Sequence, residues 1–392
     1  MTENKRKRKL SLVIPCLNEE ETIGMVVKKG RTSLKKLGID GEVVVSDNGS
    51  IDKSEAIARR EGARVVNCPK KGYGNALRFG FEEAKGEFII MGDADDSYDF
   101  SDIKAFIEKL DEGYDLVMGT RLKGKIEKGA MPFLHRYLGT PVLTFVLNLF
   151  FGTRISDCNC GMRAFTKKAW RKMNLNSEGM ELASEMIIKA GILNLSIKEI
   201  PIKFYKDKRK KPPHLRSWRD GWRHLRYMLL FSPNYLFLVP GGVLVGLGLG
   251  MLVALLFNSI TILGHTLGYH FALLASLFSI LGFQLFSMGI YAKAYAFNQE
   301  LKAQDRFINK FYKVFTLEKG LALGILLFLS GFVVDAIVLK EWLDKDFGAL
   351  SRAVEVTFAS TLIVIGIQIF FSSFFISFTG AEKEKIKNNK SL

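Results

Sequence analysis

The chain has 392 residues, with 56 Lys and Arg against 40 Asp and Glu, and 48% of its positions are hydrophobic. This apolar fraction excludes a disordered chain, and only four Cys in the whole length exclude a small disulfide scaffold. The net charge of +16 suggests nucleic-acid binding, but the basic residues concentrate beside long apolar runs that begin after about Ser232, which disfavours that function. The composition therefore predicts a soluble domain joined to a membrane domain.

Residues 1–9 form a basic tail that precedes the apolar residues 10–17. This order superficially resembles a secretion signal, but the acidic Glu19, Glu20 and Glu21 follow without a small-residue cleavage site. We interpret the apolar run as a buried strand. The basic tail is equally compatible with solvent and with anionic lipid headgroups.

Short apolar runs alternate with helix-compatible or loop segments in the first half of the chain. They cover residues 10–16, 42–46, 64–67, 87–91 and 116–119. This alternation predicts an α/β fold with a Rossmann-like, mostly parallel sheet. Ligands of such sheets bind beyond the carboxyl ends of the strands, so the residues after each run are candidates for a site.

Polar segments follow the first three runs: PCLNE at 15–19, DNGS at 47–50 and KKGYG at 70–74. A carboxylate at the position of Asp47 would accept hydrogen bonds from a base or a ribose, although such residues also form ordinary turns. The cations and small residues around Lys71, next to an expected helix start, suit a diphosphate. A surface loop would have the same composition.

Asp93 and Asp95 follow the fourth run in the segment GDADDS at 92–97. Extended backbone would point both carboxylates to one face, where like charges repel unless a cation lies between them. Hard oxygen ligands of this kind suit Mg²⁺ or Mn²⁺ bridging to phosphates. An isolated acidic turn is common, so the prediction rests on its alignment with the loops of Asp47 and Lys71.

Residues 131–151 are apolar and long enough to span a membrane, yet they include His135 and Arg136. Spanning would also move the basic region from Arg163 to Arg226 outside, against the positive-inside rule. We expect an interfacial, partly embedded helix or helix pair.

Residues 216–232 have Trp218, Trp222, Leu225 and Leu229 at helical spacing, with arginines on a different face. This pattern predicts a basic amphipathic helix at the membrane interface. The alternative is a helix packed on the soluble domain.

Four further apolar runs are long enough to span, at 236–257, 269–292, 321–339 and 354–378. Lys and Arg concentrate after the second and fourth runs, so both of those segments are expected to be cytoplasmic. The prediction is a multi-pass plasma (inner) membrane protein with a transmembrane domain at 233–380 and a basic tail at 381–392. Its soluble domain and both termini would be cytoplasmic, where the Cys stay reduced. Cys158 and Cys160 lack the second Cys/His pair of a metal site.

Taken in order, the motifs form a set: VIPCLNE at 13–19, VSDNGS at 45–50, KGYG at 71–74, DAD at 93–95 and SDCNCGMRAF at 156–165. This set resembles family-2 glycosyltransferases, and more narrowly the polyprenyl-phosphate glycosyltransferases of the dolichol-phosphate mannose or glucose synthase type. The resemblance covers roughly residues 10–231. It implies a GT-A fold over 10–215, a UDP- or GDP-linked sugar donor, an undecaprenyl or dolichyl phosphate acceptor, and Mg²⁺ or Mn²⁺.

The resemblance also implies roles for individual residues. The residues that would contact the nucleotide or its diphosphate are Pro15, Asn18, Glu19, Asp47, Lys71, Gly72 and Arg121. Asp93 and Asp95 would serve the ribose or the metal. Asp157 and Arg163 match a Ser-Asp-x-x-x-Gly-Phe-Arg signature, in which Met162 replaces Phe.

Glu181 and Glu185 match an acidic segment near the acceptor. The chain departs from the family at Asp96-Ser97, where Leu-Gln is frequent, which leaves the third metal ligand and the sugar open. Asn48 replaces the second Asp of Asp-Asp-Gly-Ser, which is tolerable if Asp47 does the binding.

In the implied reaction, an oxygen of the lipid phosphate attacks the anomeric carbon and the nucleoside diphosphate leaves. A phosphate monoester with a second pKa near about 6 is already mostly ionised, so the protein mainly orients the reactants and neutralises charge. The catalytic candidates are Asp93, Asp95, Asp157, Arg163 and Glu185, and none is assigned as a general base. The candidates for the lipid phosphate are Arg163, Lys208, Arg209, Lys210, Lys211 and Arg216. For the cluster that begins at Lys208, a positive-inside flank alone is the alternative.

Two other functions share parts of this pattern. A processive polysaccharide synthase would carry a Gln-x-x-Arg-Trp motif, which this sequence lacks. A non-catalytic membrane scaffold would have eroded acidic motifs, whereas Asp47, Asp93 and Asp95 are present. The four spans would anchor the enzyme, form a homo-oligomer interface or move the product, and the sequence leaves these roles open.

Overall fold

The computed structural model describes residues 10–209, 217–257, 261–262, 265–266, 268–298, 306–348 and 352–389. The chain divides into two compact units, Met1–Phe231 and Ser232–Leu392. Each unit is described by itself.

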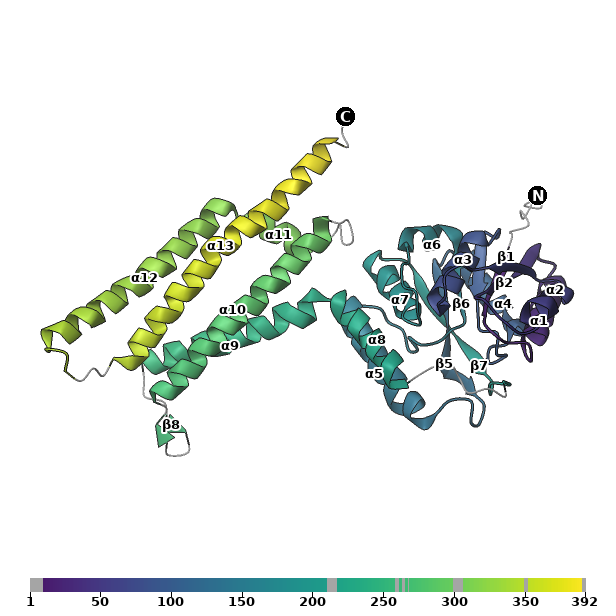
Figure 1. Cartoon of the computed structure of the whole chain (residues 1–392), viewed down its shortest axis with the longest axis horizontal. Helices are drawn as coiled ribbons and strands as arrows, with labels where there is room; N and C mark the ends of the chain where they lie inside the picture. Colours follow the sequence, from purple (N-terminus) through teal and green to yellow (C-terminus); the bar gives the residue numbers. More distant parts are fainter. Residues whose placement is uncertain are drawn as a thin grey trace. The chain divides into compact units, whose positions relative to one another are not determined.

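The first unit is built on a seven-stranded sheet with the order β3-β2-β1-β4-β6-β5-β7 (Figure 1). Its strands are β1 (Leu10–Cys16), β2 (Gly41–Asp47), β3 (Arg64–Asn67), β4 (Phe88–Met91), β5 (Leu116–Ile126), β6 (Arg163–Thr166) and β7 (Ile197–Phe204). β6 runs antiparallel to β4 and β5, and the other pairings are parallel. The α/β class and the mostly parallel sheet are confirmed.

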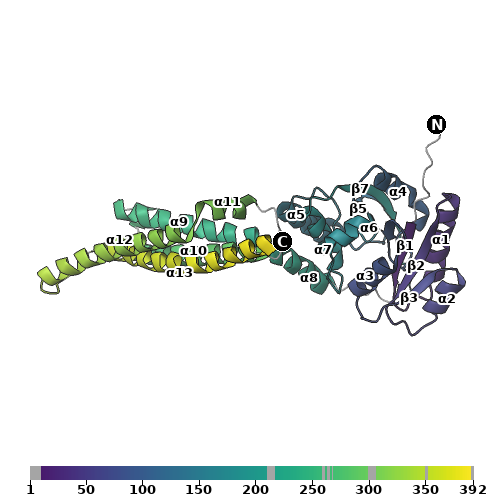
Figure 2. The same cartoon turned by 90° about the horizontal axis from the view of Figure 1, so that it is seen from above.

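Helices cover both faces of this sheet. They are α1 (Ile23–Lys36), α2 (Ser54–Arg60), α3 (Tyr73–Glu83), η1 (Phe100–Asp102), α4 (Lys104–Asp111), η2 (His135–Gly139), α5 (Thr140–Phe151), α6 (Lys167–Met173), α7 (Leu182–Ile192) and α8 (Ser217–Leu230). Figure 2 shows α1 and α2 on one side of β1 to β3 and α3 on the other. Alternate residues of β1 serve the two sides, because Leu12 and Ile14 join the core under α1, whereas Val13 joins the core under α3.

The five strands expected from the sequence are all present, and two strands were not predicted. β6 has only four residues and enters the sheet between β4 and β5, which requires long-range pairing. β7 alternates exposed and buried residues at its far edge.

The segment expected to be interfacial is one helix that runs from η2, a π-helical turn, into α5. Several of its large apolar side chains are exposed, with Phe133 at 78% and Phe145 at 65%, whereas Leu147 is buried in the core. α8 packs against α5 and α7 through one face, where Asp220, His224 and Met228 are buried. The alternative of packing on the soluble domain is therefore correct for that face of α8, while Trp218 and Trp222 stay exposed.

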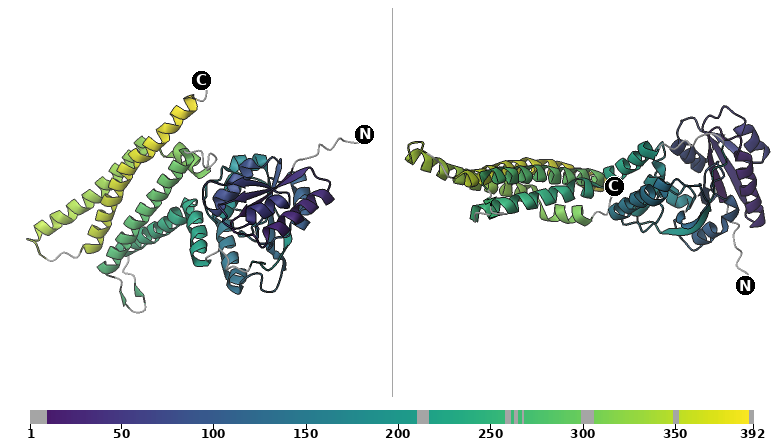
Figure 3. Two further views of the ribbon diagram at one scale, coloured as in Figure 1. Left: turned by 45° about the vertical axis from the view of Figure 1, so that its right-hand side comes forward. Right: turned by 90° about the horizontal axis from the view of Figure 1, so that it is seen from below.

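The second unit consists mainly of long helices that run side by side (Figure 3). Its elements are η3 (Asn234–Leu238), α9 (Val239–Phe257), β8 (Thr261–Ile262), β9 (His265–Thr266), α10 (Tyr269–Asn298), α11 (Arg306–Val314), α12 (Leu317–Asp344) and α13 (Ala353–Asn389). Among the described residues, four helices are long and apolar enough to cross a membrane: Asn234–Phe257, Tyr269–Tyr295, Leu317–Asp344 and Ala353–Phe378. The four predicted spans are confirmed, and most of the segment expected to be a basic tail continues helix α13.

Small and polar residues join the spanning helices. A Cβ on Gly324 would lie 2.8 Å from the carbonyl oxygen of Gly366, so α12 and α13 approach closely there. The hydroxyls of Tyr291 and Ser372, 2.5 Å apart, connect α10 to α13.

Candidate functional site

The loops after β1 and β2 are bonded to one another at the carboxyl edge of the sheet. The amide of Asn18 donates to Ser50 Oγ at 2.9 Å, and Asn18 Oδ1 accepts the amide of Ile51 at 2.9 Å. Glu19 N donates to Ser54 Oγ at 2.7 Å. Asn18 thus serves to join the two loops, in a left-handed backbone conformation with φ of 58° that Asn tolerates.

Asp47 is the last residue of β2, and one of its two carboxylate oxygens accepts hydrogen bonds from the following loop. Its Oδ2 accepts the amides of Gly49 at 2.9 Å and Ser50 at 3.0 Å. Its Oδ1 is buried and has no hydrogen-bond partner among the described residues. A buried acceptor without a donor is costly, so this oxygen suits an N–H or O–H of a ligand.

Asn48 explains the departure from the second Asp of the family motif. Its Nδ2 donates to the carbonyl of Lys70 at 2.8 Å, and its Oδ1 accepts the amide of Gly72 at 2.7 Å. A carboxylate could not donate the first of these bonds. The amide side chain therefore fixes the loop after β3 to the end of β2.

The start of α3 lies against the loop at 177–179. Gly72 has φ of 132°, and a Cβ there would lie 2.4 Å from the carbonyl oxygen of Glu178. The amides of Gly74 and Asn75 both donate to that oxygen. The expected anion-binding amides at this helix start are therefore already used, although Lys71 is exposed.

Asp93 follows β4 in irregular backbone, and Asp95 lies in the turn that begins at Ala94 rather than in the expected extended backbone. Tyr73 donates its hydroxyl to Asp93 Oδ1 at 2.8 Å, while Asp95 Oδ1 accepts the amide and the hydroxyl of Ser97 at 3.0 and 2.6 Å. Burial, followed by the charge of Asp95, raises the pKa of Asp93 to about 7. The two carboxylates are thus close enough to repel, as predicted.

We call the cluster of Glu19, Asp47, Asp93 and Asp95 at the carboxyl ends of β1, β2 and β4 the acidic edge. Arg209 reaches the acidic edge from the segment after β7. Its guanidinium lies 2.9 Å from Glu19 Oε1 and 3.2 Å from Asp95 Oδ2. Lys29 and Lys208 both pair with the buried Asp96. Lys210, Lys211 and Arg216, the other basic candidates for the lipid phosphate, lie outside the described residues.

Arg121 and Asp157 form a buried bidentate ion pair. The Nε and Nη2 of Arg121 lie 2.7 and 2.8 Å from the two oxygens of Asp157, whose Oδ2 also accepts the Arg121 amide at 3.0 Å. The guanidinium lies 5.1 Å from the centre of the Phe204 ring. The two residues were expected in different roles, and the structure brings them together as partners.

Arg163 and Glu185 are completely buried. Arg163 donates to the carbonyls of Cys160, Ala183 and Cys158. This placement contradicts the expected contact with a lipid phosphate, because the guanidinium is enclosed and joins the loop at 158–160 to Ala183 of α7. Although burial alone would raise the pKa of Glu185, Lys189 and the amides of residues 176 and 177 lower it. Glu185 therefore acts as a structural acceptor in this fold.

The acidic edge suits a divalent cation. Within the described parts of the chain, no group of three His, Cys, Asp or Glu could hold a metal by itself. Mg²⁺ commonly takes only one or two carboxylates and completes its shell with water and substrate phosphates. Asp95 offers a hard oxygen, Oδ2, that already faces a cation, and Asp93 adds a second carboxylate beside it. The donor set fits Mg²⁺ or Mn²⁺.

Sequence reasoning missed Tyr73, Tyr98 and Lys29. Tyr98 accepts the amide of Gly161 at 2.7 Å, which fixes the loop after residue 157 beside Asp93. Tyr73 lies within the KGYG motif, so its hydrogen bond to Asp93 had a local signal. Lys29 is one of several basic residues of α1, and its pairing with the buried Asp96 had no signal in the sequence.

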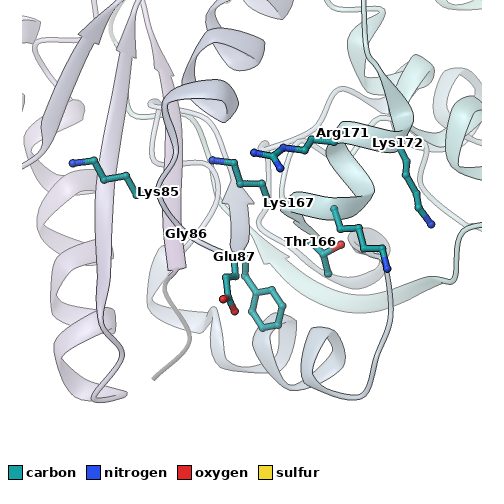
Figure 4. A pocket seen from close by; sticks show the side chains of 9 residues that line it. Lys85, Gly86, Glu87, Thr166, Lys167, Arg171 and Lys172 are labelled. Atoms are coloured by element: carbon teal, nitrogen blue, oxygen red, sulfur yellow. The ribbon is translucent and has the colours of Figure 1, made fainter. Parts of the chain in front are cut away.

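A separate basic groove of about 550 Å³ lies at the amino end of β4, away from the acidic edge. It is lined by Lys85, Gly86, Glu87, Phe88, Thr166, Lys167, Lys168, Arg171 and Lys172. Figure 4 shows that its basic side chains spread in different directions instead of converging. None of the predicted site residues lines this groove.

The fold, the acidic edge and the spanning helices define a membrane-bound glycosyltransferase, and comparisons with known proteins agree. Residues 11–173 match the model described as glycosyl transferase family 2, and residues 290–380 match the glycosyltransferase family 2 C-terminal transmembrane region. The chain is 39% identical to the low-salt glycan biosynthesis hexosyltransferase of Haloferax volcanii, over 95% of this chain and 89% of the relative. The chain belongs to glycosyltransferase family 2.

Other relatives match about half of the chain. The dolichyl-phosphate hexose transferase of Haloferax volcanii is 29% identical over 50% of this chain and 82% of that protein. Among solved structures, the glucosyl-3-phosphoglycerate synthase of Mycobacterium tuberculosis is 22% identical, with a TM-score of 0.46, over 58% of this chain and 81% of that chain. A structural similarity of this extent adds nothing to the assignment.

Proposed function

We propose that the enzyme transfers one sugar from a UDP- or GDP-linked donor to the phosphate of a polyprenyl lipid, undecaprenyl or dolichyl, with inversion at the anomeric carbon. The observation that carries the proposal is the acidic edge, where the loops after β1, β2 and β4 place Glu19, Asp47, Asp93 and Asp95 at neighbouring strand ends. A relative named dolichyl-phosphate hexose transferase supports the acceptor class. The product would be a lipid-phosphate sugar for cell-envelope or protein glycosylation.

The donor would bind along this edge. The unpartnered Oδ1 of Asp47 would accept a hydrogen bond from the base or ribose, and the exposed Lys71 would approach the diphosphate. Asp93 and Asp95 would hold a divalent cation, which supplies neutralisation of the charge that develops on the leaving diphosphate. Arg121 would support the site indirectly, because its ion pair with Asp157 holds β5 to the loop after α5.

The acceptor chemistry requires little proton transfer from the protein. The lipid phosphate is already mostly ionised at neutral pH, so its oxygen can attack the anomeric carbon directly while the nucleoside diphosphate leaves. The residues of the acidic edge orient the donor and stabilise its leaving group. No general base is needed, in agreement with the buried, fully hydrogen-bonded Glu185.

The acceptor would arrive at an apolar surface formed by η2, α5 and α8. We call this the α5–α8 surface, and its large exposed side chains include Phe133, Tyr137, Phe145, Trp218 and Trp222. Exposed aromatic residues of this kind favour the headgroup region of a bilayer. The positive-inside rule would put this surface at the cytoplasmic face of the plasma membrane.

The test is transfer of radiolabelled sugar from a panel of UDP- and GDP-sugars to a short polyprenyl phosphate, with the full chain in detergent and with Mn²⁺ or EDTA. We expect a lipid-extractable product with wild type and Mn²⁺. Asp95→Asn and EDTA should each remove most of the product. Asp40→Asn is the matched control, because Asp40 is exposed and precedes β2 at the opposite edge of the sheet.

Three outcomes would contradict the proposal. A polymeric product would favour a polysaccharide synthase, and the absence of product with every donor would favour a scaffold. Equal activity of Asp95→Asn and wild type would refute the metal site.

A further inference from the structure

The segment that runs out of β7 lies against the acidic edge. We call residues 204–209 the strap. Tyr98 pairs with Phe204 in an isolated β-bridge, and Tyr205 N donates to the carbonyl of Ser97 at 3.0 Å. The amide of Lys208 donates to the carbonyl of Asp95 at 3.4 Å. The strap therefore follows the turn that carries the proposed metal ligands.

Arg209, at the end of the strap, binds three carboxylates at once. Its Nη1 lies 2.9 Å from Glu19 Oε1, its Nη2 lies 3.2 Å from Asp95 Oδ2, and its Nη2 also lies 2.5 Å from Asp207 Oδ2. The side chains of Arg209, Glu19 and Asp95 are only 14%, 7% and 14% exposed. One guanidinium thus compensates carboxylates from two donor-site loops and from the strap itself.

The same carboxylate oxygen would be needed for a metal. Asp95 Oδ1 already accepts two hydrogen bonds from Ser97, so Oδ2 is the oxygen left for a cation. Mg²⁺ binds oxygen at about 2.0–2.1 Å and keeps a full octahedral shell. A guanidinium 3.2 Å from that oxygen would lie inside or against this shell, with like charge.

We propose that Arg209 is a built-in counter-ion that occupies the acidic edge when metal is absent and is displaced from Asp95 when a divalent cation binds with the nucleotide. Displacement leaves a guanidinium on the strap next to the incoming phosphates, so cation binding and phosphate binding by Arg209 are coupled. The acidic edge is never left as an uncompensated cluster of carboxylates. This inference rests on the metal site of the proposed function.

The test is Mn²⁺ binding to the full-length protein in detergent, measured without nucleotide by the electron paramagnetic resonance signal of free Mn²⁺. We expect Arg209→Gln to bind Mn²⁺ about tenfold or more tightly than wild type. Arg209→Lys keeps the charge but cannot bridge Glu19 and Asp95 with a planar fork, so an intermediate affinity is expected. The difference between the variants should shrink when UDP or GDP is saturating.

Lys206→Gln is the matched control. Lys206 is exposed on the same strap, and in the described structure its ammonium forms no ion pair with Glu19, Asp95 or Asp207. Removing its charge should change Mn²⁺ affinity by less than about threefold, because exposed charges are screened. If the Lys206 and Arg209 changes alter Mn²⁺ affinity equally, the effect is one of general charge, and the inference is overturned.

Asp95→Asn separates the two hypotheses. If Asp95→Asn loses Mn²⁺ binding while both Arg209 variants bind like wild type, the displacement is wrong and the metal site stands. If Asp95→Asn binds Mn²⁺ as wild type does, or if wild type and every variant fail to bind it, the metal site is wrong and the displacement falls with it.

Discussion

The ion pair of Arg121 and Asp157 offers a sharp test of how the site is held together. Asp157→Asn keeps the shape of the side chain but removes its charge, and it leaves the Arg121 guanidinium buried beside a neutral amide. Asp157 is 0% exposed and Arg121 is 7% exposed, so water cannot replace the lost partner. Breaking a buried pair from one side typically costs about 3–5 kcal/mol.

The neighbouring cysteines provide the assay. Cys158 and Cys160 are fully buried, and burial raises the pKa of their thiols to about 11 and 12, so both should be unreactive in the closed state. Labelling of the full chain in detergent, read by mass spectrometry, measures how often this loop opens. A cost of about 3–5 kcal/mol predicts labelling of both thiols at least a hundredfold faster in Asp157→Asn. Cys68 is less buried and serves as the internal reference.

Two comparisons decide whether the reasoning holds. Glu112→Gln removes an exposed partner of Lys109 and should change the labelling of Cys158 less than twofold. The double change Arg121→Met with Asp157→Leu should label more slowly than Asp157→Asn alone, because no buried charge remains unpaired. Labelling of Asp157→Asn within threefold of wild type would refute the importance of the pair.

Three further predictions concern the loops and α8. Gly72→Ala should lower donor affinity at least tenfold, because the new Cβ would lie 2.4 Å from a backbone oxygen. Gly49 has open space around it, so Gly49→Ala is the control and should cost only the conformational strain of about 1 kcal/mol. Asn48→Asp should also weaken donor binding, since it loses the bond donated to Lys70; wild-type affinity would contradict this. Burial lowers the pKa of His224 to about 4, so the unfolded chain takes up a proton below about pH 6.5 before the folded one does. Stability should therefore be complete above pH 6.5 and fall by up to about 3 kcal/mol toward pH 4, and His224→Gln should flatten this thermal-unfolding profile.

The sequence alone determined the local features of this protein. Short β-branched runs predicted five of the strands, and apolar length predicted the four spanning helices. The motifs predicted that Asp47 and Asp93 would follow strand ends, because strands and turns have short-range signatures. Helical spacing likewise put Trp218 and Trp222 of α8 on a face apart from the arginines, and both tryptophans are exposed.

Only the tertiary structure decided which charged groups became partners. Asp157 pairs with Arg121 across 36 residues, and Arg209 reaches Asp95 across 114. The residue type of Arg163 and its place in the motif suggested a phosphate ligand. In the fold, however, the insertion of β6 into the sheet buries the Arg163 side chain among backbone carbonyls. A sequence motif specifies a functional group and its local backbone, whereas the partner of a charge depends on strand order and burial, which arise from pairing between distant segments.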